Sequence, residues 1–233
     1  MPPGTRDEPS GPRSSRDRAG GVEEVEHLTN EDGSVSRRWL EGEDMAGYTT
    51  RDLTEIPEGL PVPVDDGRAR HLTGIPVPSA PLLGTTGERI DLSKIPGRVV
   101  VFAYPRTGQP GQPPLTPDWD LVPGARGCTP ETCGFRDLAA DFGKLGIRIF
   151  GLSTQEPDYQ RELAERLHLP FPVLSDASRA LTDALRLPTL TIGGYVLLAR
   201  LSWLQRDGRI ERVWYPVFPP DRHASEVLAA LSA

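Results

Sequence analysis

Two cysteines, Cys128 and Cys133, are the only thiols in the chain, and four residues separate them. They belong to the segment GCTPETCGFRD, residues 127–137, which follows a loop rich in Pro and Gly and begins a helical pattern. A thiol at the N-terminus of a helix faces unpaired N–H groups and the positive end of the helix dipole, which favour the thiolate and lower the thiol pKa. Because the thiolate is the nucleophilic form of cysteine, this position predicts redox chemistry at Cys128.

A disulfide between the two thiols requires a change in the helix. Five residues of ideal helix place Cα atoms about 8–9 Å apart, with about 140° of rotation between them. A disulfide joins Cα atoms less than about 7 Å apart, so pairing of Cys128 with Cys133 requires the first turn to unwind after one thiol is oxidised to a sulfenic acid. The alternative is two inert core cysteines. The junction of strand, loop and helix, flanked by Arg126 and Arg136, favours the redox interpretation.

The residues around the cysteines predict strands that alternate with helices. A β-branched and aromatic run at 99–104 is typical of a strand buried on both faces. It precedes a long loop at 105–127, and apolar residues spaced by three and four predict a helix over 129–145. Further strands are expected at 147–152, 171–174, 197–204 and 210–217, and further helices at 158–167, 177–187 and 224–231. The pattern predicts an α/β fold with a mixed central sheet flanked by helices.

The N-terminal quarter of the chain has a different composition. Residues 1–20 are nearly all Pro, Gly, Ser, Arg and Asp, which cannot bury enough apolar area to offset the cost of ordering the backbone. Residues 22–58 stay acidic and polar, and a solvated tail is favoured there over a short docking helix. We therefore predict a disordered or partly helical acidic tail at 1–58 and one folded domain at 59–233.

Composition bounds the function classes. The formal net charge is −7, with 33 acidic against 26 basic residues, so no broad basic face is expected and nucleic acid is not an expected partner. The longest apolar run is too short to cross a bilayer and the N-terminus lacks the pattern of a signal peptide, so we expect a cytoplasmic protein that does not associate with membranes. His27, His71, His168 and His223 are scattered, and no Gly-rich phosphate loop follows a strand. No metal or other cofactor is expected.

The cysteine segment resembles a known family. Residues 127–137 are similar to the Gly-Cys-Thr-x-x-x-Cys-x-Phe-Arg-Asp stretch of the bacterioferritin-comigratory, or Q-type, peroxiredoxins of the redoxin family. Supporting stretches occur in the same order at 99–105, 150–154, 169–176 and 200–210. The resemblance covers about residues 70–232. It implies a thioredoxin-like fold and thiol-dependent reduction of hydrogen peroxide or organic hydroperoxides.

The resemblance also implies roles for individual residues. Cys128 corresponds to the peroxidatic thiol, which forms a sulfenate, and Cys133 to the resolving thiol, which closes an intramolecular disulfide. Arg200 corresponds to the guanidinium that steadies thiolate and peroxide. Thioredoxin or a similar dithiol protein would return the electrons, and a monomer is implied. Independently, Arg200 lies in an apolar stretch where an unpaired arginine is costly, which favours a guanidinium facing the site over one that reaches solvent at a strand edge.

The chain departs from the family just before Cys128. Family members usually carry Pro seven residues and Thr three residues before the peroxidatic cysteine, and here those positions are Leu121 and Ala125. A Pro-x-Thr fragment remains at Pro105 and Thr107, so the sequence indicates an insertion at residues 108–123.

Two arrangements could replace the missing threonine. Either the loop brings Thr107 beside Cys128, or Arg126 substitutes as a charged donor. Pro105, Gly127 and Thr129 complete the candidate contributors to the site. If neither arrangement holds, loss of one hydrogen bond to a charged group would cost about 1.5–3 kcal/mol, so activity would drop about tenfold or more and still exist.

Two other functions fit the same residues. One is a non-catalytic redox sensor or partner-binding module on the same fold, with the acidic N-terminal segment as its interaction element. The other is a protein disulfide reductase, which is disfavoured because such enzymes generally have two residues between their thiols instead of four. A sensor oxidises once, whereas a peroxidase must cycle when a dithiol reductant is supplied.

Overall fold

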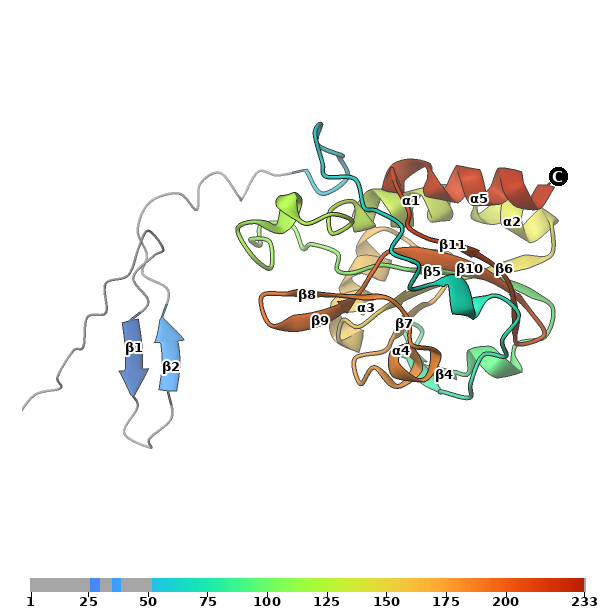
Figure 1. Cartoon of the computed structure of the whole chain (residues 1–233), viewed down its shortest axis with the longest axis horizontal. Coiled ribbons are helices and arrows are strands. Elements are labelled where there is room, and N and C mark those ends of the chain that lie inside the picture. Colours follow the sequence, from blue (N-terminus) through green and yellow to red (C-terminus); the bar gives the residue numbers. More distant parts are fainter. Residues whose placement is uncertain (1–25, 30–34, 39–51, 233) are drawn as a thin grey trace, which may run out of the picture. The chain divides into compact units, whose positions relative to one another are not determined.

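Strand β5 (Arg98–Ala103) lies in the middle of the central sheet, as the sequence predicts. In the computed structural model, which describes residues 26–29, 35–38 and 52–232, its residues from Val99 on are buried. The sheet has seven strands in the order β11-β10-β5-β6-β7-β3-β4 (Figure 1). The other strands are β3 (Leu82–Gly84), β4 (Arg89–Ile90), β6 (Ile147–Ser153), β7 (Val173–Ser175), β10 (Leu201–Arg206) and β11 (Arg209–Trp214).

Parallel and antiparallel pairs meet at β5. Strands β5, β6 and β7 run parallel, whereas β10 pairs antiparallel with β5 and β11 pairs antiparallel with β10. Strand β3 pairs antiparallel with β7, and β4 with β3. The predicted mixed sheet is therefore confirmed. The register sets Leu201 opposite Ala103, which brings the start of β10 to the edge where β5 ends.

Alternation along β5 divides the core into two layers. Val99, Val101 and Ala103 join the cluster that includes Leu181 and Leu185 of α4 (Ala180–Leu185). Val100, Phe102 and Tyr104 join the cluster on the opposite face. That second cluster is covered by α1 (Cys128–Asp137), α2 (Ala139–Lys144), α3 (Pro157–Arg166) and α5 (His223–Ser232). The sheet is thus flanked by helices on both faces (Figure 1).

Two predicted elements are each divided in the structure. The helix predicted at 129–145 is α1 followed by α2, because the backbone leaves helical geometry at Leu138 and a tight bond from the Asp141 N–H to the Leu138 carbonyl starts the next turn. The strand predicted at 197–204 is β9 (Tyr195–Leu198) followed by β10. Strand β9 pairs with β8 (Thr189–Ile192), which the sequence analysis missed, in a separate two-stranded sheet.

Division of that strand places Arg200 differently from the prediction. Arg200 occupies a bend between β9 and β10 instead of a strand interior. The Ala199 N–H bonds to the Pro188 carbonyl, and the ladder with β5 begins at Leu201. A side chain at such a bend is free of the in-and-out alternation of a strand. Arg200 can therefore reach across the end of β5 toward α1.

The inserted segment 108–123 packs on the β8–β9 hairpin. Trp119, at the start of a short 3₁₀ turn, forms a small third core with Ala125, Ile192 and Leu197. Partly buried Leu115 and Val122 pack against the same cluster. The sequence predicted a long loop here, and this core explains how a segment rich in Pro and Gly holds one conformation.

The predicted tail is described only in part. Glu26–Thr29 (β1) and Val35–Arg38 (β2) pair as antiparallel strands where a helix was an alternative. Residues 1–25, 30–34 and 39–51 lie outside the described residues, so the boundary at 58 and the disordered or partly helical tail stay predictions.

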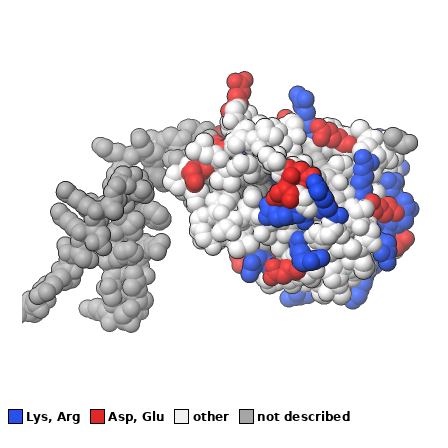
Figure 2. Space-filling model, viewed as in Figure 1, with Lys and Arg blue, Asp and Glu red and all other residues white. Residues whose placement is uncertain are grey.

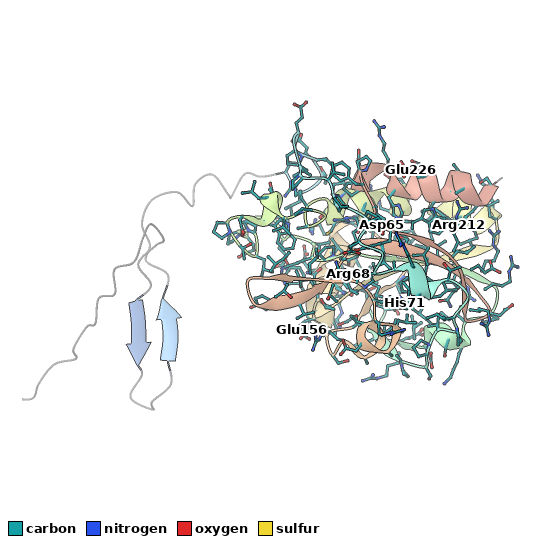
Figure 3. The ribbon with its side chains drawn as sticks, in the orientation of Figure 1. Asp65, Arg68, His71, Glu156, Arg212 and Glu226 are labelled. Carbon is teal, nitrogen blue, oxygen red and sulfur yellow. The ribbon has the colours of Figure 1, made fainter. Side chains whose placement is uncertain are left out.

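The surface of the described domain is polar and mixed in charge. Acidic and basic side chains are interspersed on the face drawn in Figure 2. Arg212 of β11 donates from Nη1 to the Ala230 carbonyl, which ties this edge strand to α5 (Figure 3). Within residues 26–29, 35–38 and 52–232, no helix combines the length and apolar character that a membrane span needs. The same ranges contain no group of three or more His, Cys, Asp or Glu side chains that could hold a metal ion.

Candidate active site

Cys128 is the first residue of α1 and is 2% exposed. Gly127 precedes it with φ 99°, in the left-handed region that favours glycine. A Cβ atom at Gly127 would lie 2.3 Å from Pro220 Cγ, so a side chain cannot be accommodated without a shift of the chain. This glycine lets the loop turn sharply and places the Cys128 thiol at the helix N-terminus, as the sequence predicts.

Arg200 reaches the thiol from the bend before β10. Its Nη2 donates to Cys128 Sγ over 3.1 Å, and the side chain is buried. The same nitrogen also lies within hydrogen-bond distance of the carbonyl oxygens of Gly124, Ala125 and Arg126, at 3.0–3.4 Å. These carbonyls fix the direction of the guanidinium. The structure therefore confirms that Arg200 faces the site and does not reach solvent.

Glu131 is a site residue that the sequence analysis missed. Arg200 Nη1 forms an ion pair with Glu131 Oε2, one helical turn beyond Cys128, and the Glu131 side chain is fully buried. An acidic residue in the first turn of a helix is usually a solvated partner of the helix dipole, so the sequence offers no signal that this one faces inward. Burial raises the pKa of Glu131 to about 7, although the Arg200 charge acts to lower it.

Burial also raises the pKa of the Cys128 thiol above its ordinary value. The Arg200 guanidinium and the backbone N–H of Arg106 oppose this rise, whereas the Glu131 carboxylate adds to it. The lowered pKa that the sequence predicts is thus wrong for the closed site. The physical reason is that a helix N-terminus sealed from water favours the thiolate less than burial disfavours it.

Thr107 and Cys128 line the same cavity, so the loop brings the Pro-x-Thr fragment back to the site. The Thr107 hydroxyl, however, donates to Gln155 Oε1 over 3.1 Å, and the Thr107 N–H bonds to the same oxygen. Arg126 turns its Nη2 toward the carbonyls of Asp52 and Glu55. The hydrogen bond to the sulfur that the structure shows comes from the Arg200 guanidinium.

The remaining candidates surround this cavity, whose volume is about 60 Å³. Gly127 and Thr129 line it together with Arg126, Thr107 and Cys128. Pro105 lies just beyond the end of β5, and its carbonyl accepts a hydrogen bond from the Ser153 hydroxyl. The structure thus brings the predicted contributors to one end of the sheet.

Cys133 lies apart from the cavity lining, in the same helix. Both cysteines are free thiols, and Cys133 is half-buried among the apolar residues between α1 and the sheet. Burial raises the pKa of Cys133, and the nearby Arg136 charge acts to lower it. Because α1 is continuous from Cys128 to Asp137, a disulfide between the thiols requires its first turn to open, as the spacing predicts.

His223 packs behind α1 as a neutral, buried imidazole. Its Nε2 lies 2.7 Å from the Ser202 hydroxyl, and its ring meets Phe135 edge-on. Burial, with a smaller contribution from the Arg200 charge, lowers the pKa of His223 to about 3. Below pH 6.5 the unfolded chain binds a proton at this residue that the folded protein does not. His223 therefore contributes stability that is present above pH 6.5 and is lost as the pH falls toward 3.

We predict that His223→Gln weakens this acid sensitivity. Wild type should lose about 2–3 kcal/mol of unfolding free energy through His223 between pH 7.5 and 4.5, and the glutamine variant should not. Glutamine retains a polar group that can contact Ser202. Glu131, whose pKa is also shifted, is present in both proteins and contributes equally to the pH dependence of their stability. Urea unfolding of both proteins at the two pH values measures the difference. An equal pH dependence in both proteins would contradict the prediction.

The sequence of the chain is similar to those of known proteins. Residues 72–231 match the Redoxin family. The chain is 29% identical over 163 residues to peroxiredoxin Bcp of Bacillus subtilis, covering 68% of this chain and 93% of that protein. It is 29% identical over 158 residues to a chloroplastic peroxiredoxin Q of Populus jackii, covering 67% of this chain and 66% of that protein.

The structure of the chain is similar to solved structures of proteins from the same group. Peroxidoxin BcpB of Mycobacterium tuberculosis superposes with a TM-score of 0.54 at 29% identity, covering 69% of this chain and 96% of its own. The bacterioferritin comigratory protein of Xanthomonas campestris, studied for alkyl peroxide reduction, superposes with a TM-score of 0.52 at 25% identity, covering 66% of this chain and 90% of its own.

Proposed function

Because the chain belongs to the Redoxin family, we propose that it is a thiol-dependent peroxidase in which Cys128 reduces hydrogen peroxide or an organic hydroperoxide. The predicted thioredoxin-like fold is confirmed by the sheet and by its structural relatives. The single observation that carries the proposal is the contact of 3.1 Å between Arg200 Nη2 and Cys128 Sγ. A guanidinium held against a helix-terminal thiol stabilises both the thiolate and the charge that develops on a bound peroxide.

The first step follows from these groups. The Cys128 thiolate attacks the terminal oxygen of the hydroperoxide, so an S–O bond forms and the O–O bond breaks. Cys128 is oxidised to a sulfenic acid, and the peroxide leaves as an alkoxide or hydroxide that takes up a proton to give an alcohol or water. The Arg200 guanidinium, which donates to the sulfur, is also placed to stabilise the reacting oxygens.

The second step requires helix α1 to open. The Cys133 thiolate attacks the sulfenic sulfur of Cys128, so an S–S bond forms and the S–O bond breaks, and the departing hydroxide takes up a proton to give water. A thioredoxin-like dithiol protein then reduces this disulfide by thiol exchange. Support for the intramolecular disulfide comes from the shared helix of the two cysteines and from the absence of any other cysteine in the chain.

Replacement of Cys133 by serine should stop the cycle after one turn. Cys128 in Cys133→Ser should react with one equivalent of peroxide and remain a sulfenic acid, because no second thiol can displace water from it. Trapping with dimedone and intact mass measurement detect this state. Wild type treated in the same way should instead lose two hydrogens and no longer react with dimedone. Undiminished thioredoxin-dependent turnover by Cys133→Ser would contradict the resolving role.

Peroxide consumption by pre-reduced protein, with an excess of a thioredoxin system, tests the proposed function. Many turnovers per protein establish a peroxidase. A single turnover would instead favour the redox sensor, a second candidate that the raised pKa of the buried Cys128 thiol supports. Efficient cleavage of insulin disulfides without peroxide consumption would favour a disulfide reductase.

The proposal also includes a monomeric, cytoplasmic protein. Support for the monomer comes from the resemblance of the cysteine segment, and support for the compartment comes from the two cysteines, which are too few for a disulfide-stapled secreted scaffold. Light scattering of the reduced and oxidised protein measures the assembly state. Fractionation of cells that express the native chain measures the compartment.

A further inference from the structure

The cavity at Cys128 is lined partly by a residue that precedes the family match and partly by the inserted segment. The match begins at residue 72, yet Leu53 lines the cavity that contains Cys128. The inserted segment 108–123 contributes Leu115 and Trp119 to the same lining. Beside polar residues such as Arg106 and Gln112, the cavity is therefore lined by apolar side chains from two parts of the chain that lie far apart in the sequence.

Specific contacts hold the segment 52–56 at the cavity. Arg126 Nη2 donates to the Asp52 carbonyl over 2.8 Å and to the Glu55 carbonyl over 3.2 Å. These two hydrogen bonds fix the backbone on both sides of Leu53. Leu53 Cδ2 lies 2.8 Å from the position that a Cβ atom at Gly108 would occupy. Only a glycine at 108 leaves room for this leucine without a shift.

The part of the lining that the inserted segment contributes is anchored in a core of its own. Trp119 is 7% exposed and packs with Ile192 and Leu197 of the β8–β9 hairpin. Gly193, at the tip of that hairpin, lies so close to the insertion that a Cβ there would meet Thr116 Cγ2 at 2.8 Å. Because this part of the lining is packed on a hairpin, it cannot retreat easily from a substrate that is too large.

The cavity beside Cys128 is small and is partly open to solvent. About 60 Å³ is room for roughly four water-sized groups, and a hydroperoxide takes up about two of them. A small alkyl group fits in the remaining volume, whereas an aryl tail needs more room and would press on the lining, to which Leu53 belongs. We propose that Leu53 is a specificity-determining residue that admits small hydroperoxides to Cys128 and excludes bulky ones. This inference rests on the proposed peroxidase activity.

Three hydroperoxides of increasing size test the role of Leu53. The values of kcat/KM for hydrogen peroxide, tert-butyl hydroperoxide and cumene hydroperoxide are measured in wild type, Leu53→Ala and Leu53→Trp under a thioredoxin system. Leu53→Ala should raise the value for cumene hydroperoxide about tenfold, the lower range of what extra methylenes are worth in a pocket, and change that for hydrogen peroxide less than about twofold. Leu53→Trp should lower all three values of kcat/KM, most for cumene hydroperoxide and least for hydrogen peroxide.

Leu121→Ala is the matched control. Leu121 is another leucine of the loop region, but it is 76% exposed and does not line the cavity, so its replacement should leave the three values unchanged. Equal changes for all three peroxides in Leu53→Ala, or no change, would overturn the inference while leaving the peroxidase in place. Absence of turnover by wild type with every peroxide would instead remove the proposed function.

Discussion

Cys128→Ser is expected to reduce thioredoxin-dependent peroxide turnover to the level of the reaction without protein. A serine hydroxyl at this position can still accept a hydrogen bond from Arg200, but it is neither ionised near neutral pH nor able to form a sulfenic acid. No other group in the cavity can replace it, because Cys133 is absent from the lining residues. Peroxide consumption, followed beside wild type at equal protein concentration, measures the loss.

The variant must fold for this result to be informative. Serine differs from cysteine by one atom, and the acceptor for Arg200 is retained, so thermal unfolding should shift by only a few degrees. Cys133→Ser serves as the matched control, since it keeps the reactive thiol and should consume one equivalent of peroxide. If Cys128→Ser retained turnover, Cys133 would have to be the attacking thiol, and the proposed roles of the two cysteines would be wrong.

The parts of the site that sequence predicts are those with local causes. The strand before the loop is fixed by a continuous run of apolar residues, and the helical segment after it by apolar residues spaced by three and four. The need for helix opening follows from the spacing of two residues in one helix. Such inferences depend on neighbours in the chain, so they hold without knowledge of the packing.

The parts that sequence misses depend on residues far apart in the chain. Glu131 is an ordinary first-turn acid until Arg200, 69 residues away, is seen to bind it in the core. Leu53 falls in a segment predicted as tail, and only its place beside Gly108 reveals a wall. The predicted strand through Arg200 failed because an apolar run alone does not mark where a chain passes from one sheet to another.

Arg200→Met is expected to destabilise the fold and to slow catalysis strongly, for two separable reasons. One buried cation serves two acids, Glu131 and Cys128, on the first turn of α1. Without it, a carboxyl group that is fully buried loses its ion-pair partner, which costs about 3–5 kcal/mol when the acid is charged. Catalysis falls because the donor that stabilises the developing oxyanion is gone, typically about a hundredfold or more.

The raised pKa of Glu131 also determines how the free energy of unfolding changes with pH. The pKa of Glu131 is raised to about 7, so the folded protein holds a proton there that the unfolded chain has released above pH 4.5. Glu131 therefore costs stability as the pH rises from about 4.5 to about 7, in total about 3 kcal/mol. In Arg200→Met the pKa of Glu131 should rise further, and the loss of stability should continue above pH 7.

Glu131→Gln, alone and combined with Arg200→Met, separates stability from catalysis. The amide has the size of the acid and no charge, so the double variant should recover most of the unfolding free energy that Arg200→Met loses at pH 8 but none of its peroxide turnover. Glu131→Gln alone should flatten the pH dependence of unfolding and lower the pKa of Cys128, because the carboxylate that raises it is gone. Urea unfolding at pH 5 and 8 measures the unfolding free energy, and thiolate absorbance followed against pH measures the pKa of Cys128. If stability were not restored in the double variant, Glu131 would not be the group that Arg200 compensates, and the guanidinium would be held in the core by the thiol and the loop carbonyls alone.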